Sequence, residues 1–299
     1  MTRRWSVALV AAALVAVGAC DRSPASRGDT AVASGPLTPI MYEATGPSGH
    51  KAIVFGTMHA GVDPAELPAW VMSRYQAAPA FAMETDPGEA MGLAALMMRT
   101  DGTTLEAELG PAYWAKLEAK LGKDEAARLQ PLKTSAAAAA LEAHGLPTTE
   151  TMDLVLHDGA FNAGKHMTYL EKPEVQLRAL DIVLDGRALR QMLDDPGTGL
   201  DDNQRLLTAY RSGDTAALEA LYAEGERKSR AAGLTDVEVA AQTAVMLTDR
   251  NRAWIPVIET AVAQQDIFIA VGAMHLCGDK GVPALLAARG FKVQRVTGP

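Results

Sequence analysis

Two apolar strands that each end in Gly-x-x-His constrain this chain more than any other feature of its sequence. The residues Ile53-Val-Phe-Gly-Thr-Met-His59 form a continuous apolar run that ends in a glycine and a histidine. The same pattern returns near the C-terminus in Ile267-Phe-Ile-Ala-Val-Gly-Ala-Met-His275. Continuous apolar runs bounded by turn residues are typical of strands that are buried on both faces of a sheet. We therefore expect an α/β fold with both histidines at the carboxyl edge of its sheet, where ligands bind.

Gly56 and Gly272 each precede a histidine by three residues. Without a Cβ, glycine lets the backbone turn sharply and lets a ligand or a neighbouring strand come close. A single histidine at such a place is often a core residue that bonds a carbonyl oxygen. Two imidazoles at equivalent strand ends need a further reason, because burying a polar group without a partner costs free energy. The pair therefore predicts a functional site that contains His59 and His275.

A third apolar run, Ala80-Phe-Ala-Met-Glu84, ends in an acid. Between it and the first strand, Leu67, Val71 and Tyr75 recur every four residues and predict a helix. The strands of such a strand–helix–strand unit are expected to be parallel, which places Glu84 on the same edge as His59. Glu84 could instead be a solvated strand end or a helix-capping acid.

The remaining chain predicts a small mixed sheet, largely parallel, surrounded by many helices, with a helical insertion in the middle of the chain. Residues 89–145 are expected to be helical, and residues 166–171 to form a strand that ends in an acid. One long helix is expected over residues 173–192 and another over 248–264. Residues 291–296 alternate in polarity, which is typical of an edge strand.

The overall charge excludes one class of partner. The chain of 299 residues has a formal net charge of −8, so a nucleic-acid-binding surface is not expected. Only two cysteines are present, Cys20 and Cys277. We interpret Cys277, two residues after His275, as a small packing residue, because free cysteine is commonly found in protein cores.

The first residues are typical of a targeting segment. Arg3 and Arg4 precede the apolar run Val7–Val17, which is too short to span a membrane. The run ends in Val17-Gly-Ala-Cys20, which resembles the signal of bacterial lipoproteins, where cleavage leaves an acylated cysteine. An ordinary secretory signal with a chance cysteine is the alternative. Residues 1–20 are thus predicted to be a lipoprotein signal peptide, with Cys20 as the lipidation site.

The segment after Cys20 is predicted to be a flexible tether. Residues 21–39 are rich in Ser, Gly, Pro and Ala, and the folded domain is expected over residues 40–299. The lipid would hold the domain on the periplasmic side of the bacterial cell envelope. Asp21 after the cysteine resembles an inner-membrane retention signal, although this rule varies between bacteria.

Over residues 40–298 the chain resembles the TraB/GumN family, which also contains pheromone-shutdown proteins. The family is related to the Tiki proteases and, more distantly, to erythromycin-esterase-like and haem-binding ChaN-like proteins. The resemblance rests on an ordered set of motifs, namely Val54-Phe-Gly-Thr-Met-His59, Met83-Glu84, Met152-Asp153 through Gly164-Lys165, Leu170-Glu171, Gln176-Leu177, Asp249-Arg-Asn251, Val271-Gly-Ala-Met-His275-Leu276 and Gly278 through Val293. It departs in Cys277, where family members usually have an aliphatic residue.

The resemblance implies a metal-dependent hydrolase fold whose catalytic face contains both Gly-x-x-His motifs and the acid. Tiki-like relatives are described as metalloproteases that use manganese or cobalt. Two imidazoles and a carboxylate also suit a divalent metal such as Mn, Co, Zn or Fe. We therefore expect His59 and His275 as metal ligands, and Glu84 as a ligand or general base.

Five further residues are predicted around these three. Arg250 is the candidate for stabilising an oxyanion, because its charge is permanent and its donors are fixed. It could instead form a structural ion pair with Asp249, Asp153 or Glu171. The resemblance places Asp153, Glu171, Gln176 and Asn251 behind the ligands as supporting residues.

Two functions from different classes are expected from these residues. The first is a metal-dependent hydrolase, similar to peptidases and esterases, that acts on a peptide or a small molecule. The second is a non-catalytic lipoprotein that uses the same histidines to hold a metal or haem, or that sequesters a peptide. The carboxylate favours the first, because haem ligation needs histidine or tyrosine but no adjacent glutamate.

Overall fold

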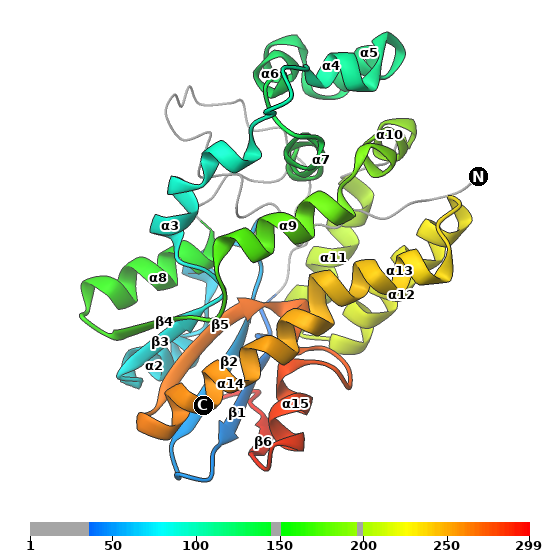
Figure 1. Ribbon diagram of the computed structural model, residues 1–299. Helices are drawn as coiled ribbons and strands as arrows, with labels where there is room; N and C mark the ends of the chain where they lie inside the picture. Colours follow the sequence, from blue (N-terminus) through cyan, green and yellow to red (C-terminus); the bar gives the residue numbers. More distant parts are fainter. Residues whose placement is uncertain (1–35, 145–150, 196–199) are drawn as a thin grey trace.

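The computed structural model describes residues 36–144, 151–195 and 200–299 (Figure 1). Its described strands form one six-stranded sheet in the order β4-β3-β5-β2-β1-β6. The strands are β1 (Met41–Thr45), β2 (Lys51–Thr57), β3 (Ala80–Met83), β4 (His166–Tyr169), β5 (Ile267–Gly272) and β6 (Lys292–Arg295). The predicted signal peptide, Cys20 and Asp21 lie outside the described residues.

The sheet is mixed and largely parallel, as the sequence predicts. β5 pairs in parallel with β2 on one side and β3 on the other, and β4 pairs in parallel with β3. β1 is antiparallel to both β2 and β6, and β6 is an edge strand as expected. The strands of the predicted strand–helix–strand unit, β2 and β3, are therefore parallel but not adjacent, because β5 lies between them.

Helices connect the strands and cover the sheet. The first part of the chain contains η1 (Pro64–Glu66) and α2 (Ala69–Ala77) before β3, then α3 (Pro87–Gly92), η2 (Ala94–Met97), α4 (Leu105–Leu109), α5 (Pro111–Leu121), α6 (Lys123–Leu129), α7 (Thr134–Ala143) and α8 (Met152–Asn162). After β4 come α9 (Pro173–Val183), α10 (Gly186–Asp194), α11 (Leu200–Ser212), α12 (Thr215–Ala231), α13 (Asp236–Thr243), η3 (Ala244–Thr248) and α14 (Asp249–Gln264), and after β5 come η4 (Ala273–Leu276) and α15 (Val282–Ala288).

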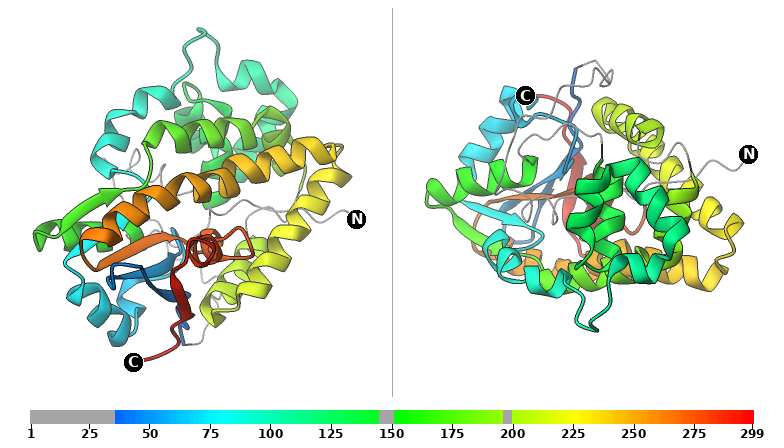
Figure 2. Two further views of the ribbon diagram at one scale, coloured as in Figure 1. Left: turned by 60° about the horizontal axis from the view of Figure 1, so that its bottom comes forward. Right: turned by 90° about the horizontal axis from the view of Figure 1, so that it is seen from above.

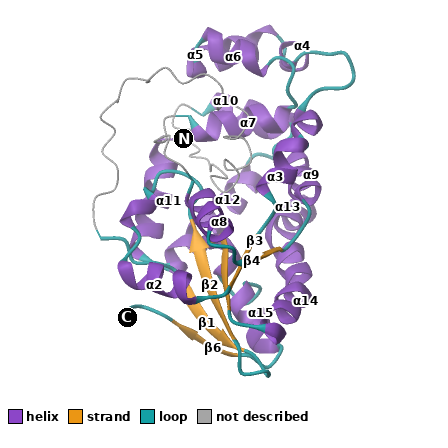
Figure 3. Cartoon of the chain, turned by 90° about the vertical axis from the view of Figure 1, so that its left-hand side faces the viewer, coloured by secondary structure: helices purple, strands orange, loops and turns teal. Residues whose placement is uncertain are grey.

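The helical insertion lies beyond the end towards which the parallel strands point. Figures 1 and 3 show α4 to α7 and α10 stacked above that end of the sheet. Figure 2 shows α14 on one side of the sheet and α2 and α8 on the other. The carboxyl edge of the sheet is therefore enclosed by helices, so polar groups placed there are shielded from water.

The core forms because the central strands are apolar on both faces. Every residue of β5 is buried, and so is every residue of β2 after Lys51. Tyr75 of α2 meets the ring of Phe268 edge-on at 5.4 Å and that of Phe81 at 6.0 Å. Burying an aromatic or aliphatic side chain of this size stabilises a fold by about 1.5–3 kcal/mol. These contacts hold α2 against the sheet, as its four-residue apolar spacing predicts.

A continuous helical ridge passes from α13 through η3 into α14 (Figure 1). Within it, Ala244–Thr248 is a π-helix, and the N–H of Asp249 donates to the carbonyl of Ala244, five residues back. Single π-turns inside α-helices are frequent at functional sites. The helix predicted over residues 248–264 is confirmed as α14, although the π-turn joins it to α13, so that the whole ridge begins earlier, at Asp236.

Two other boundaries differ from the sequence prediction. Residues 173–192 form two helices rather than one, because Asp185 caps α10 by accepting from the N–H of Ala188 at 2.9 Å. The packed part of the chain begins before Ile40, since Leu37 is buried and the N–H of Thr38 donates to Arg211 O at 2.7 Å. None of the described helices is long and apolar enough to span a membrane.

Replacing Gly56 with alanine should destabilise the fold. A Cβ on Gly56 would lie 3.0 Å from Ala273 Cα and 3.3 Å from Ile40 Cβ, so backbone atoms would have to move. We expect a loss of about 1–3 kcal/mol in the free energy of unfolding, measured in urea. The matched control is Gly298→Ala, whose Cβ would meet nothing within 4 Å. Equal stability of the two variants would contradict the close approach at Gly56.

Candidate functional site

His59, Glu84 and His275 leave three adjacent strands at one edge of the sheet. Thr57 of β2 pairs with Gly272 of β5, and Met83 of β3 pairs with Ala270 of β5. The residues that follow these strand ends therefore emerge side by side. All three side chains are buried, with exposed fractions of 7% for His59, 5% for Glu84 and 3% for His275.

Gly272 marks the point where the three side chains meet. A Cβ on Gly272 would lie 3.4 Å from His59 Nε2, 3.4 Å from Glu84 Oε1 and 3.6 Å from His275 Cδ2. Neither Gly272 nor Gly56 has a positive φ, so close approach rather than a sharp turn requires glycine at both positions. The structure thus brings together the three residues that the sequence selects for the centre of the site.

Asp153 orients and charges His59. Its Oδ2 lies 2.7 Å from His59 Nδ1, and its Oδ1 accepts from the Thr57 hydroxyl at 2.7 Å. Burial opposes a charge on the imidazole, but the attraction and hydrogen bond of Asp153 outweigh burial and raise the pKa of His59 to about 9. Asp153 itself lies in the first turn of α8, where the helix dipole favours an anion.

Asn251 keeps His275 neutral, in contrast to the charged His59. Its Oδ1 lies 2.6 Å from His275 Nδ1, and its Nδ2 donates to Lys280 O at 2.9 Å, which sets the orientation of the amide. Because an amide oxygen only accepts, Nδ1 carries the proton of His275 and Nε2 has a lone pair. Burial, together with the charges of Arg250 and His59, lowers the pKa of His275 to about 3. His275 is therefore neutral.

Glu84 is ionised and almost fully hydrogen-bonded. Its Oε1 accepts from Gly272 N at 2.8 Å, and its Oε2 accepts from Arg250 Nη2 at 2.6 Å and from Gln176 Nε2 at 3.1 Å. Burial would raise the pKa of this carboxyl, but the charges of Arg250 and His59 and the N–H of Gly272 hold the pKa at about 2. A general base works best with a pKa near the working pH, so these contacts favour Glu84 as a ligand or charge partner.

Arg250 joins Glu84 to a second acid. Its Nε lies 2.9 and 3.1 Å from the two oxygens of Glu171, so the structural ion pair left open by the sequence exists with Glu171. Its Nη1 donates to Met246 O at 3.1 Å and lies 3.4 Å from His275 Nε2. The second Nη1 hydrogen, towards His275, is the donor that Arg250 can offer to a bound group.

Burial raises the pKa of Glu171, and Arg250 partly offsets this effect.

The other proposed partners of Arg250 are engaged elsewhere. Asp249 pairs with Arg252 at 2.7 Å, and Asp153 faces His59. All four residues predicted to support the ligands thus contact the site: Asp153 through His59, Asn251 through His275, Gln176 through Glu84 and Glu171 through Arg250.

Sequence reasoning missed three contributors to the site. Trp254 donates to Glu171 at 3.1 Å, and its ring packs 4.4 Å from that of His275. It lies four residues after Arg250, so the helical repeat could have placed both on one face. Thr57 lies inside the first Gly-x-x-His motif. The carbonyl of Met246 had no sequence signal, because its acceptor role depends on the π-turn.

Two further residues, Cys277 and His157, lie outside this centre. Cys277 is half-buried, and burial raises the pKa of its thiol to about 12, which supports its interpretation as a packing residue. His157 contacts Asp158 at 2.8 Å and the Tyr169 hydroxyl at 3.2 Å. Within the part of the chain that the structure describes, neither side chain hydrogen-bonds to His59, His275 or Glu84.

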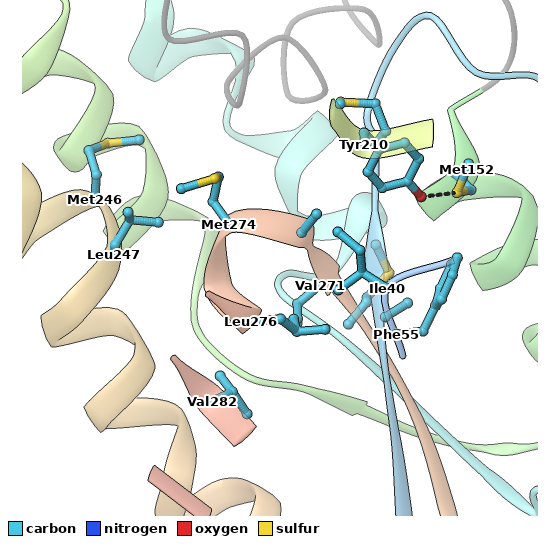
Figure 4. Packing of buried hydrophobic residues seen from close by; sticks show 14 of the residues in the cluster. Ile40, Phe55, Met152, Tyr210, Met246, Leu247, Val271, Met274, Leu276 and Val282 are labelled. Carbon is cyan, nitrogen blue, oxygen red and sulfur yellow. Dashed lines mark hydrogen bonds between the residues drawn. The ribbon is translucent and has the colours of Figure 1, made fainter. Parts of the chain in front are cut away.

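The site forms the floor of a cavity with about 970 Å³ of empty space, part of it in the open mouth. The walls come mainly from α12, α13, η3 and η4. Figure 4 shows Met246 and Leu247 of η3 close to Met274 of η4.

The imidazoles are oriented as metal ligands usually are, but the side chains at the centre are already hydrogen-bonded to one another. Each imidazole has its Nδ1 against an acceptor, which leaves Nε2 for a ligand, as in most metal-binding histidines. Within the described residues, however, no group of three or more His, Cys, Asp or Glu side chains has the arrangement of a metal site. A metal ion bound by both Nε2 atoms and Glu84 would have to displace Arg250 Nη1 from Nε2 of His275, and Glu84 would have to release one of its present donors.

Fold and site together define an α/β protein with a buried His–Glu–Arg–His centre beneath a largely apolar cavity. Residues 40–295 match the family model of the TraB/PrgY/gumN family, and the chain belongs to that family. Comparisons with curated proteins and with solved structures returned no match.

The His59–Asp153 pair should make stability depend on pH in the metal-free protein. The folded pKa of about 9 lies above the ordinary value of 6.5, so the pair stabilises the fold fully below pH 6.5. This contribution is lost as the pH rises through about 9, and it is on the order of 3 kcal/mol at most. Urea unfolding in a chelator across this range should show a steeper loss for the native protein than for Asp153→Asn. Parallel curves would contradict the pairing.

Proposed function

We propose that this protein is a hydrolase of acyl compounds whose reaction centre is His59, Glu84, Arg250 and His275. The observation that carries the proposal is the convergence of two imidazole Nε2 atoms and a buried carboxylate at the floor of one cavity. Charged groups of this kind are costly to bury, and they cluster where they bind or activate a substrate. The neighbouring apolar walls exclude water, which strengthens each electrostatic interaction at the centre.

Each residue has a distinct role in this proposal. His59, whose Nδ1 is bound to Asp153, would present its Nε2 to a metal ion. Glu84 balances the charge of Arg250 and orients the attacking water. The Nη1 donor of Arg250 stabilises the oxyanion that forms on the substrate carbonyl. Neutral His275 offers a second Nε2 lone pair.

We propose a divalent metal ion, Mn, Co, Zn or Fe, as the cofactor, with His59 and His275 as ligands and Glu84 as the third. When bound, such an ion lowers the pKa of its water to about 7 and polarises a carbonyl. Asp153 and Asn251 would then hold the remaining proton of each imidazole on Nδ1, which directs both Nε2 atoms at the ion. The neutral state of His275 already suits this role.

Non-catalytic binding of a metal, haem or a peptide is the alternative function. The enclosed cavity favours it, because the cavity could hold a ligand without chemistry. The Glu84–Arg250 pair favours hydrolysis, since haem ligation does not need a charged pair beside the histidine. A Soret band in the purified protein would identify the haem binder.

Removing either site histidine should abolish metal uptake. We expect His59→Ala and His275→Ala each to lose calorimetric binding of Mn²⁺ and Zn²⁺ and at least a hundredfold in ester or peptide hydrolysis. His157→Ala is the matched control, since His157 bonds Asp158 and Tyr169 outside the centre. Circular dichroism would verify that each variant folds. Unchanged metal uptake in both site variants would contradict the proposed ligand set.

Glu84→Gln separates the two roles left for Glu84, because glutamine keeps the size of the side chain and removes its charge. We expect metal uptake to fall together with hydrolysis, as for a ligand. Retained metal with lost turnover would instead identify a general base. The two quantities are measured on one preparation by calorimetry and by the rate at saturating substrate.

We also propose that the protein is a lipoprotein of the bacterial cell envelope, with the folded domain on the periplasmic side. The support is the order of Arg3, Arg4, the apolar run and Cys20 in the sequence. The acidic Asp21 supports the inner membrane. The lipid would be the contact with the membrane, and the substrate would be a peptide or a small molecule.

Cys20→Ser should prevent lipid attachment. We expect an unprocessed precursor or a free soluble form in place of the membrane-bound protein, because serine cannot form the thioether. Labelling with a radioactive fatty acid, followed by membrane fractionation, measures both effects, and Cys277→Ser is the matched control. Unchanged labelling in Cys20→Ser would show that the segment is not a lipoprotein signal.

A further inference from the structure

We propose that the substrate is an ester or amide of a carboxylic acid with a linear apolar chain, and that this chain lies in the cavity above the site. The inference rests on the proposed hydrolase function and names the class of its substrate. The reactive carbonyl would lie at the floor, beside His59, Arg250 and His275. Hydrolysis then breaks the acyl C–O or C–N bond, and water supplies OH to the acyl carbon and a proton to the leaving group.

The walls of the cavity are apolar from several elements at once. Eight aliphatic or methionine side chains line it: Val183, Leu206, Leu218, Leu221, Val239, Met246, Leu247 and Met274. Leu218 and Leu221 lie one turn apart on α12, and Met246 and Leu247 face the same space from η3. Such walls favour the binding of an apolar group, because each buried methylene contributes about 0.8 kcal/mol to the binding free energy. Methionine side chains adapt to chains of different shape.

The polar groups of the walls are largely bound to one another. The Tyr222 hydroxyl lies 3.2 Å from Thr243 Oγ1, and the Thr243 hydroxyl donates to Glu226 Oε1 at 2.7 Å. Glu226 also pairs with Arg230 at 3.5 Å. An extended peptide would bring a backbone N–H and C=O at every residue, and each would need a partner. An alkyl chain needs none, so these walls favour the alkyl chain.

The boundary between this cavity and a second one, which we call the neck, limits the length of the apolar path. A second cavity of about 650 Å³ is lined by the same Val183, Gly225, Ser229 and Gln242, so the two cavities meet at these residues. Its own walls include charged Asp185 and Arg187. The apolar path therefore runs from the site to the neck and ends there. Gly225 lies in the middle of α12 and lines both cavities, so we expect a larger side chain at this position to narrow the neck.

The test compares p-nitrophenyl acetate, butyrate, octanoate and laurate with the full metal-loaded protein. We expect kcat/KM to rise by up to about fourfold per methylene that enters the cavity, and then to level off. Gly225→Leu should lower the chain length at which the rise stops. Gly225→Ala is the control, because its small side chain also suits a helix. Ser229→Leu narrows the same neck and replaces Gly225→Leu if that variant does not fold.

A binding measurement separates this inference from the proposed function. Calorimetry with butanol, hexanol and octanol measures binding in the cavity without turnover. The affinity for the alcohol should rise with the length of its alkyl chain. Hydrolysis of the acetate without any gain for longer chains would overturn the substrate class and leave the hydrolase standing. Alcohol binding that strengthens with chain length, without hydrolysis of any ester, would overturn the hydrolase function and support an alkyl chain as the occupant of the cavity. Flat alcohol binding, or faster cleavage of extended apolar peptides than of any ester, would overturn the inference.

Discussion

The guanidinium of Arg250, shared between Glu84 and Glu171, is the interaction on which the rest of the site depends. It joins α14 to the ends of β3 and β4 within a space that is almost closed to water. Removing one partner of a buried ion pair costs about 3–5 kcal/mol, because the other charge is left without compensation. The trio therefore holds the helical ridge to the carboxyl edge, and Arg250 helps to lower the pKa of Glu84 to about 2, so that Glu84 is ionised at neutral pH.

The π-turn in η3 couples this ion pair to the cavity. Because the helix is wound more loosely there, the carbonyl of Met246 is available to the Arg250 side chain four residues later. The same turn directs Met246 and Leu247 to the cavity wall. Any movement of the ridge would thus change the position of the cation and the shape of the wall together.

The two histidines show how neighbouring residues assign different chemistry to one motif. Both follow Gly-x-x and both are buried, yet the pKa of His59 is raised to about 9 and that of His275 is lowered to about 3. The difference is the partner of Nδ1, the carboxyl group of Asp153 for His59 and the amide of Asn251 for His275. In the metal-free protein one imidazole can therefore carry a proton while the other offers a lone pair.

By itself, the sequence determined the α/β class, the buried strands and the edge at which His59, Glu84 and His275 meet. It could do so because strand burial and strand ends are read from apolar runs and turn residues that are local in the chain. Only the tertiary structure decided that β5 lies between β2 and β3, that Asp153 faces His59, and that α12, α13 and η3 enclose the cavity. These contacts join residues far apart in the chain, and their free energy comes from packing and buried charge, for which no short stretch of sequence carries a signal.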